Sequence, residues 1–150
     1  MSLATTDHLT VSPIADADLD AVVELWTRCD LLRPWNNPRS DIAFARNRPN
    51  SDVLVGRHNG TIVAAVVVGH DGHRGTVYYV AVDPHFQNKG FGRAVMSAAE
   101  NWLRERGIAK LNLMVRAENG NVRSFYDALG YGEQARVVYA KWLDGRAPTP

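Results

Sequence analysis

The chain has 150 residues, of which 45% are hydrophobic and 22% are charged. This length and composition indicate one soluble globular domain over residues 1–150 that buries its own core, with loose tails at about 1–7 and 145–150. The 17 Lys and Arg residues and 16 Asp and Glu residues give a formal net charge of +1. This balance creates no broad positive field, so we expect no nucleic-acid partner and no membrane partner.

Cys29 is the single cysteine, which excludes an internal disulfide and a cysteine-based metal site. A free thiol suits a reducing compartment, and no secretion signal opens the sequence, so we expect a cytoplasmic protein. The longest apolar run, residues 62–68, is too short to span a bilayer. His70 and His73 lie close in the sequence, but no cysteine or carboxylate cluster completes a coordination set, so we predict no metal.

The first part of the chain predicts one strand followed by two helices. A short strand is expected over residues 9–11, and the helical spacing of apolar residues predicts a helix over 17–29 with Asp16 as its N-cap. A second helix should follow, because Asn37 can cap it and Pro38 can occupy its first position.

A hairpin and a central strand come next. Residues 52–58 and 61–68 flank Asn59-Gly60, a dipeptide that supplies the positive φ angles of a two-residue turn. Residues 76–82, TVYYVAV, then predict a central strand, because β-branched and aromatic side chains fill it and an Asp-Pro pair closes it.

Strands and helices alternate in the second half of the chain. We expect a helix from the glycine-rich segment 87–92 to Arg106, a strand over 110–115, a helix around 122–129 and a closing strand over 135–143. A hairpin followed by a strand-helix-strand crossover predicts an α+β fold, in which helices flank a mixed sheet.

The glycine-rich segment has the pattern of a phosphate-binding loop. In FQNKGFG, residues 86–92, two glycines stand two positions apart directly before a helix, where backbone N–H groups can converge on an anion. A Walker P-loop is excluded, because Lys89 precedes Gly90 and Phe91 follows it. A dinucleotide-binding fingerprint requires a small residue at the position of Val95. Val95 therefore argues against this fingerprint and against a nucleotide-dependent oxidoreductase.

Two segments resemble signatures of the GNAT superfamily of N-acetyltransferases. QNKGFG, residues 87–92, is similar to the Q/R-x-x-G-x-G/A motif that binds the pyrophosphate of coenzyme A. VRAENGNVRSFYDALGY, residues 115–131, resembles the second signature, in which an Asn precedes a helical Tyr and a Leu-Gly-aromatic end. DLLRPWNNP, DGHRG and YYV further resemble small bacterial members. The resemblance implies a GNAT fold with splayed central strands and acetyl-CoA as cosubstrate, without a metal.

The resemblance also implies where coenzyme A would lie. The main chain of the central strand would pair with the pantetheine arm, as when an extended chain adds to a sheet edge. A backbone amide there would stabilise the oxyanion of the tetrahedral intermediate. Lys89 and Arg93 would flank the phosphates or, alternatively, are solvated surface charges. The expected cofactor-binding residues are Val80, Ala81, Val82, Gln87, Asn88, Lys89, Gly90, Phe91, Gly92, Arg93, Asn119 and Tyr126.

Tyr126 is the catalytic residue that the resemblance implies. A phenol with a pKa of about 10 can protonate the thiolate that leaves when an amine attacks acetyl-CoA. The alternative is a core aromatic, because Phe125 and Leu129 share its helical stripe. Asn119 would contact the cofactor arm or, alternatively, would only open a helix.

The general base stays open, because Met114 stands where some relatives have a glutamate. Glu118, His73, Asp71 or a water held by strand carbonyls are the alternatives. The acceptor would approach between the loop after the first helix and the turn before the central strand, where cationic and aromatic side chains suit a carboxylate and an apolar surface. The candidate acceptor-binding residues are Arg33, Trp35, His73 and Arg74.

These features predict an acyl-CoA-dependent N-acetyltransferase that moves an acetyl group to a primary amine by direct transfer in a ternary complex. A covalent acetyl-enzyme is disfavoured, because Cys29 ends a helix and no nucleophile occupies a signature position. The acceptor is expected to be a small-molecule amine or a peptide or protein amine, and the protein a monomer or homodimer. A coenzyme A binding or sensing module with weak or lost catalysis is the alternative, motivated by Met114.

Overall fold

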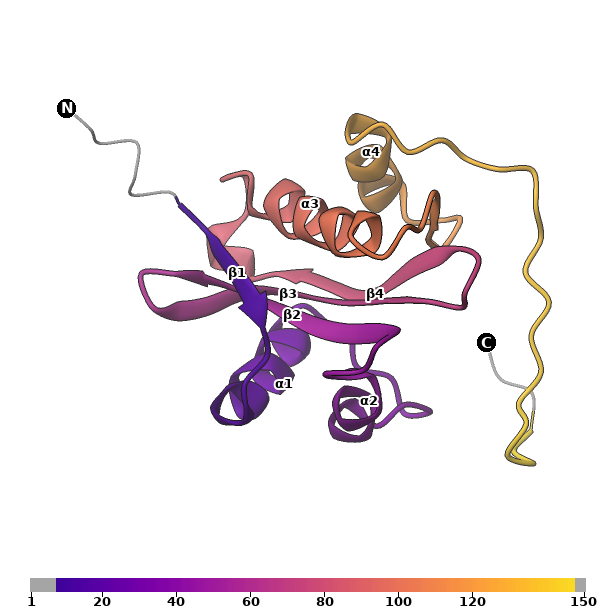
Figure 1. The fold of residues 1–150 in the computed structure, drawn as a ribbon, viewed down its shortest axis with the longest axis horizontal. Coiled ribbons are helices and arrows are strands. Elements are labelled where there is room, and N and C mark those ends of the chain that lie inside the picture. The colour runs from indigo at the N-terminus through magenta and orange to yellow at the C-terminus, as the bar shows by residue number, and fades with distance from the viewer. Residues whose placement is uncertain (1–7, 148–150) are drawn as a thin grey trace. The chain divides into compact units, whose positions relative to one another are not determined.

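The computed structural model describes residues 8–147 (Figure 1). The predicted tail at residues 1–7, and residues 148–150 of the other tail, lie outside the described residues. The chain divides into two compact units, Met1–Met114 and Val115–Pro150. Among residues 8–147, no helix combines the length and the apolar character that crossing a membrane requires.

The first unit is built on a five-stranded mixed sheet in the order β1-β2-β3-β4-β5. Strands β1 to β4 pair antiparallel, whereas β4 and β5 run parallel. This arrangement confirms the α+β fold with a mixed sheet. The strands are β1 (Thr10–Pro13), β2 (Ser51–His58), β3 (Thr61–His70), β4 (Gly75–Val82) and β5 (Leu111–Asn112).

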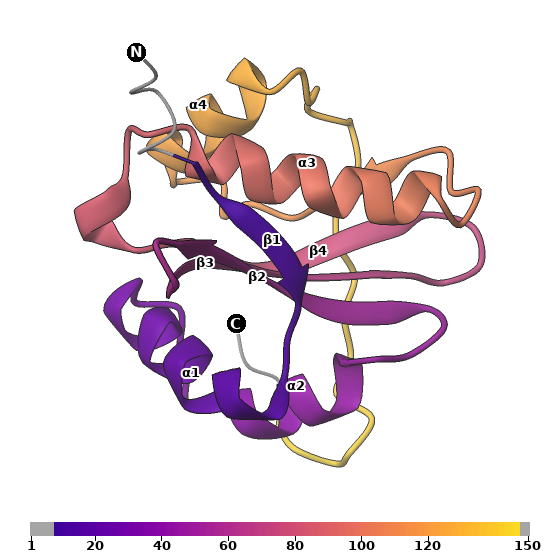
Figure 2. The ribbon, with the colours of Figure 1, turned by 60° about the vertical axis from the view of Figure 1, so that its left-hand side comes forward.

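Helices cover both faces of this sheet (Figures 1 and 2). Helices α1 (Leu19–Arg28) and α2 (Pro38–Ala45) lie on one face, and α3 (Phe91–Arg104) lies on the other. The α1 and α2 face holds a core cluster of buried side chains that includes Trp26 and Ile42. Helix α3 is amphipathic, and its buried side chains are Phe91, Val95, Met96, Ala99, Trp102 and Leu103.

Local signals placed the hairpin and the second helix correctly. Asn59 and Gly60 adopt φ angles of 51° and 81° between β2 and β3, as a two-residue turn requires. The Asn37 side chain accepts a hydrogen bond of 3.1 Å from the backbone N–H of Ser40, and Pro38 begins α2. Both expectations are confirmed.

The start of the first helix differs from the expectation. A 3-10 turn, Asp16–Asp18, precedes α1. The side chain that bonds the backbone at this turn is Asp18, not Asp16: it accepts a hydrogen bond of 2.8 Å from the Ala15 backbone N–H. Asp16 instead forms an exposed ion pair of 2.8 Å with Arg46. The Asp18 carboxylate is held inward because it also binds Arg57 of β2, a contact that sequence spacing cannot reveal. The first strand is shifted too, to Thr10–Pro13 from the expected 9–11.

The expectations for the last elements are partly wrong. Strand β5 has only 2 residues instead of the expected 110–115, and α3 ends at Arg104, two positions before the expected end. The second unit contains α4 (Gly120–Ala128), as expected, but residues 135–143 form no strand. Most apolar side chains of that segment are exposed, Tyr139 to 92%. A suitable residue pattern makes a strand only where a partner strand supplies the hydrogen bonds.

Candidate functional site

The β4 strand has an edge that β5 leaves open. The two strands pair only at Gly75 with Leu111 and at Thr76 with Asn112, whereas β4 continues to Val82. In the described part of the chain, no other strand takes up that side of β4. The backbone beyond Thr76 therefore has strand geometry and an edge to which an extended molecule can add.

A β-bulge interrupts β4 in the middle of this stretch. Val67 pairs with Tyr78 and Ala65 pairs with Ala81, so β4 has one residue more than β3 between the two pairs. Tyr79 lies in the bulge with a φ of 53°. Beyond it, the Ala81 side chain is buried, whereas Val80 and Val82 are half-buried.

Asp83 connects the end of β4 to the next segment. Its buried carboxylate accepts a hydrogen bond of 2.9 Å from the backbone N–H of His85, which begins the 3-10 turn Pro84–Phe86. Arg28 of α1 donates to the same carboxylate at 2.9 Å. Burial alone would raise the pKa of Asp83, but the hydrogen bonds from His85 and the charge of Arg28 outweigh it and lower the pKa.

The glycine loop leads directly into α3. Gly90 is the N-cap of α3 with a φ of 80°, and Asn88 has a φ of 64°. A Cβ added at Gly90 would meet no atom within 4 Å, so a ligand has open space there. The first N–H groups of a helix have no acceptor within it and carry the positive end of its dipole, so this terminus suits an anion.

Phe91 anchors this loop to the rest of the first unit. Its side chain is buried, and its ring lies 5.3 Å from the His58 ring and 6.4 Å from the Phe86 ring, measured between centroids. Phe91 can therefore offer only its main chain to a ligand. Gln87, Asn88, Lys89 and Arg93 have exposed side chains, and Gly92 is the second residue of α3.

The candidate acceptor residues fall into two groups that lie in different segments of the chain. Arg33 and Trp35 lie in the segment after α1, where the Arg33 guanidinium donates to the Leu32 carbonyl at 2.8 Å. His73 and Arg74 lie in the turn before β4, and their backbone N–H groups donate to Asp71 at 2.9 and 2.8 Å. These bonds lower the pKa of the exposed Asp71. At about 3.3 Å per residue, the turn lies roughly 16 Å from the bulge.

The second unit carries the predicted catalytic tyrosine on α4. The Asn119 side chain caps this helix by accepting a hydrogen bond of 3.2 Å from the Val122 backbone N–H. Tyr126 is buried, and its ring makes edge contacts with Phe125 and Tyr131 at 4.9 and 5.7 Å. Burial raises the pKa of Tyr126 to about 12. Glu118 is exposed, and Met114 ends the first unit with 59% of its surface exposed.

The sequence did not reveal how three residues meet at the bulge. Tyr79 stacks on Trp26 of α1 with centroids 3.9 Å apart, and its hydroxyl donates to Asp41 of α2 at 2.7 Å. In the sequence, Trp26 belongs to the apolar stripe that predicts the helix over 17–29, so it is expected only in the core, and the residue pattern gives no signal for Asp41. The ion pair between Arg28 and Asp83 was equally hidden, because its partners are far apart in the chain.

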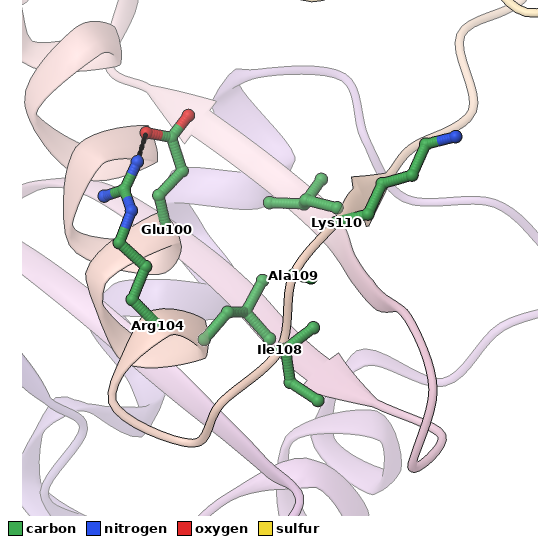
Figure 3. A pocket seen from close by; sticks show the side chains of 7 residues that line it. Glu100, Arg104, Ile108, Ala109 and Lys110 are labelled. Carbon is green, nitrogen blue, oxygen red and sulfur yellow. Dashed lines mark ion pairs between the residues drawn. The ribbon is translucent and has the colours of Figure 1, made fainter.

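A small pocket of about 90 Å³ lies at the other end of α3 (Figure 3). Glu100 and Arg104 form an ion pair of 3.6 Å beside it. A helix of 14 residues is about 21 Å long, so this pocket is remote from Gly90. The lining residues are Glu100, Leu103, Arg104, Ile108, Ala109, Lys110 and Leu111. Within residues 8–147, no group of three His, Cys, Asp or Glu side chains is arranged to hold a metal.

Comparisons with known proteins place this geometry in context. Residues 19–131 match the family described as acetyltransferase (GNAT) family. An acetyltransferase of Yersinia pestis is 44% identical over 126 residues, which cover 84% of this chain and 89% of the relative. The crystal structure of the ribosomal-protein-S18-alanine N-acetyltransferase from Escherichia coli is 28% identical, covers 93% of this chain and 88% of its own, and has a TM-score of 0.72.

A more distant enzyme shares the fold. AAC(6')-Iy, solved in complex with the bisubstrate analogue CoA-S-monomethyl-acetylneamine, is 15% identical to this chain and has a TM-score of 0.75. The match covers 90% of this chain and 98% of AAC(6')-Iy.

Proposed function

Because the chain belongs to the acetyltransferase (GNAT) family, we propose that it transfers an acetyl group from acetyl-CoA to a primary amine, directly and within a ternary complex. One observation carries the proposal: the open edge of β4 leads through a short turn to a glycine loop at the start of α3, where the free N–H groups of the helix suit an anion. A pantetheine arm needs extended pairing and a pyrophosphate needs converging N–H groups, and both features follow one another here.

The proposed cofactor site is therefore mostly main chain. The backbone of Val80, Ala81 and Val82 would pair with the pantetheine amides, and an amide of this stretch would stabilise the oxyanion as the amine attacks. The amides from Gln87 to Gly92 would bind the pyrophosphate, with Lys89 and Arg93 next to the phosphates. No metal takes part in this proposal.

Tyr126 is the proposed general acid. The amine attacks the thioester carbon, the tetrahedral intermediate collapses with cleavage of the carbon–sulfur bond, and the phenol gives its proton to the departing thiolate. With a pKa of about 12, the phenol is protonated at neutral pH, as an acid must be. We assign no side chain as the base; a water would take the ammonium proton, and solvent would return a proton to the Tyr126 phenolate.

The acceptor class is supported by what related proteins act on. The Escherichia coli neighbour is named for a ribosomal-protein alanine, and other solved neighbours are aminoglycoside acetyltransferases. We propose an amine acceptor, either a small molecule or an amine on a protein. As its binding residues we prefer Arg33 and Trp35 to His73 and Arg74. Arg33 and Trp35 directly follow α1, the helix whose Trp26 contacts Tyr79 in the bulge. A cytoplasmic location is part of the proposal, supported by the single free Cys29.

The decisive experiment combines binding with turnover. Titration calorimetry should detect coenzyme A and not NAD, and an amine panel read by thiol release from acetyl-CoA should include small polyamines, aminoglycosides and peptides with free N-termini. Acetyl-CoA hydrolysis without amine is the blank. Binding without turnover on any amine would favour a coenzyme A sensing module, and absence of binding would refute the proposed site.

A further inference from the structure

Tyr79 has a backbone conformation that its side chain disfavours. Five described residues other than glycine have a positive φ, and four of them are Asp or Asn. Those two residue types tolerate the left-handed region, because their short polar side chains bond locally. A bulky aromatic residue there is an outlier that persists only when its surroundings hold it.

The strained residue coincides with the bulge of β4. The extra residue of β4 lies between Tyr78 and Ala81, immediately before the backbone of the proposed cofactor site. Bulges bend a strand and re-aim the groups that follow. The angle of Tyr79 therefore sets the direction of the Val80 to Val82 main chain.

Two helices hold Tyr79 from the same side of the sheet. Its ring lies nearly parallel to the fully buried Trp26 indole of α1, at an angle of 10°, with centroids 3.9 Å apart. Its hydroxyl donates to the Asp41 carboxylate of α2 at 2.7 Å. Burial and the nearby Asp41 raise the pKa of Tyr79, so the phenol keeps the proton that this hydrogen bond needs.

Stability alone does not explain the choice of tryptophan at this position. The Trp26 indole Nε1 is buried and has no hydrogen-bond partner among the described residues. A buried donor without an acceptor is unfavourable, and a purely apolar side chain would avoid it. The large flat ring is better explained as a platform that fixes the Tyr79 ring.

We propose that the Trp26–Tyr79–Asp41 contact is a positioning device for acetyl transfer. Tyr79 is a positioning residue: α1 and α2 hold its ring and hydroxyl, and thereby keep the bulge in the shape that aims the Val80 to Val82 backbone at the thioester. The inference rests on the proposed function for its catalytic part. The pyrophosphate loop is held separately, through Phe91 and Asp83, so coenzyme A affinity should depend on this contact much less than turnover does.

Four variants test the device through its hydrogen bond. Tyr79→Phe keeps the stacked ring and removes the hydroxyl, and Asp41→Ala removes the acceptor. Each should lower kcat about 10-fold or more, because small misplacements at a reacting centre are costly, and change coenzyme A affinity less than about 3-fold. Asp41→Asn retains an acceptor oxygen and should restore most of the turnover. Tyr78→Phe, at the neighbouring half-exposed tyrosine, should match wild type.

A second readout does not depend on activity. In Tyr79→Phe and Asp41→Ala, backbone hydrogen exchange should accelerate in peptides that cover residues 79–82 and stay unchanged in the β2–β3 hairpin. Wild-type turnover together with wild-type exchange in both variants would overturn the proposal and leave Tyr79 as a packing residue. Faster exchange with unchanged kcat would overturn its catalytic part. A wild-type protein that binds no coenzyme A would refute the proposed function instead, while the exchange experiment would still decide whether the contact holds the bulge.

Discussion

Tyr126 is the residue at which the catalytic and the structural interpretations differ most. A general acid works only while protonated, so turnover should be lost as pH rises through the raised pKa of about 12. Between pH 7 and 10, kcat should therefore show no decline from this phenol. Tyr126→Phe should lower kcat by roughly 10²- to 10⁴-fold, by the same factor across that range, with little change in acetyl-CoA affinity.

The control for this variant is Tyr139→Phe, which removes a hydroxyl from a tyrosine that is 92% exposed and should leave kcat unaltered. Steady-state kinetics at fixed saturating amine across the pH range provides the measurement. Near wild-type turnover in Tyr126→Phe would identify Tyr126 as a core aromatic packed on Phe125 and Tyr131, and another group or water as the proton donor.

Gly90 permits a second residue-scale test, because the same helix offers a matched glycine. Gly90 and Gly107 flank α3 with φ angles of 80° and 78°, and an added Cβ would meet nothing at either position. Aspartate tolerates this conformation. Gly90→Asp places a carboxylate where the pyrophosphate would bind and should weaken coenzyme A binding at least about tenfold, or about 1.4 kcal/mol by calorimetry.

Gly107→Asp is the control, since it introduces the same side chain and a similar backbone requirement at the far end of α3. Its coenzyme A affinity should equal that of wild type. Equal affinities in both variants, with both folded by circular dichroism, would remove the anion-binding role of the loop.

At the scale of elements, the ion pair between Arg28 and Asp83 joins the end of α1 to the connection between β4 and α3. Asp83→Ala removes the acceptor for Arg28 and for the His85 backbone N–H. We expect a loss of about 1–3 kcal/mol in the free energy of unfolding, measured with urea, because the lost hydrogen bonds involve a buried charge. Coenzyme A affinity should fall too, since the glycine loop begins at this turn.

Asp16→Ala is the matched control for that variant. Asp16 also pairs with an arginine of another element, Arg46, but its side chain is 98% exposed. Exposed ion pairs contribute little, so its unfolding free energy should change by no more than about 0.5 kcal/mol. Similar losses in the two variants would show that the Asp83 contacts do not order the connection.

At the scale of the whole molecule, two buried carboxylates predict how stability depends on pH. The hydrogen bond from Arg57 lowers the pKa of Asp18, and the contacts of Asp83 lower its pKa despite burial. The unfolded chain, with aspartate pKa values near 3.9, then takes up protons at higher pH than the folded protein. The free energy of unfolding should be fully retained above about pH 5 and decrease as pH falls below about 4.

Urea unfolding at several pH values from 3 to 7 measures this dependence. Asp18→Asn should be less stable than wild type at pH 6, because Arg57 loses its charged partner, but should lose less stability on acidification. A wild-type slope in Asp18→Asn would show that this carboxylate has the same pKa in the folded and unfolded states.

Much of the fold follows from short stretches of sequence. The turn at Asn59-Gly60, the cap at Asn37, the strand that became β4 and the glycine loop before α3 were all predictable, because each depends on the conformational preferences of a few consecutive residues. The same holds for the family, since both of its signatures are continuous segments. The candidate cofactor residues were chosen from these local signals and stay a prediction.

The tertiary structure decided what depends on distant partners. Asp18 replaced Asp16 because Arg57 draws it inward, and residues 135–143 have a strand pattern but form no strand among the residues that the structure describes. Tyr79 lies in the bulge with a positive φ because Trp26 and Asp41, from two separate helices, hold it there. Local sequence determines which backbone conformations have low energy, whereas contacts between residues far apart in the chain decide where a conformation of higher energy is stabilised.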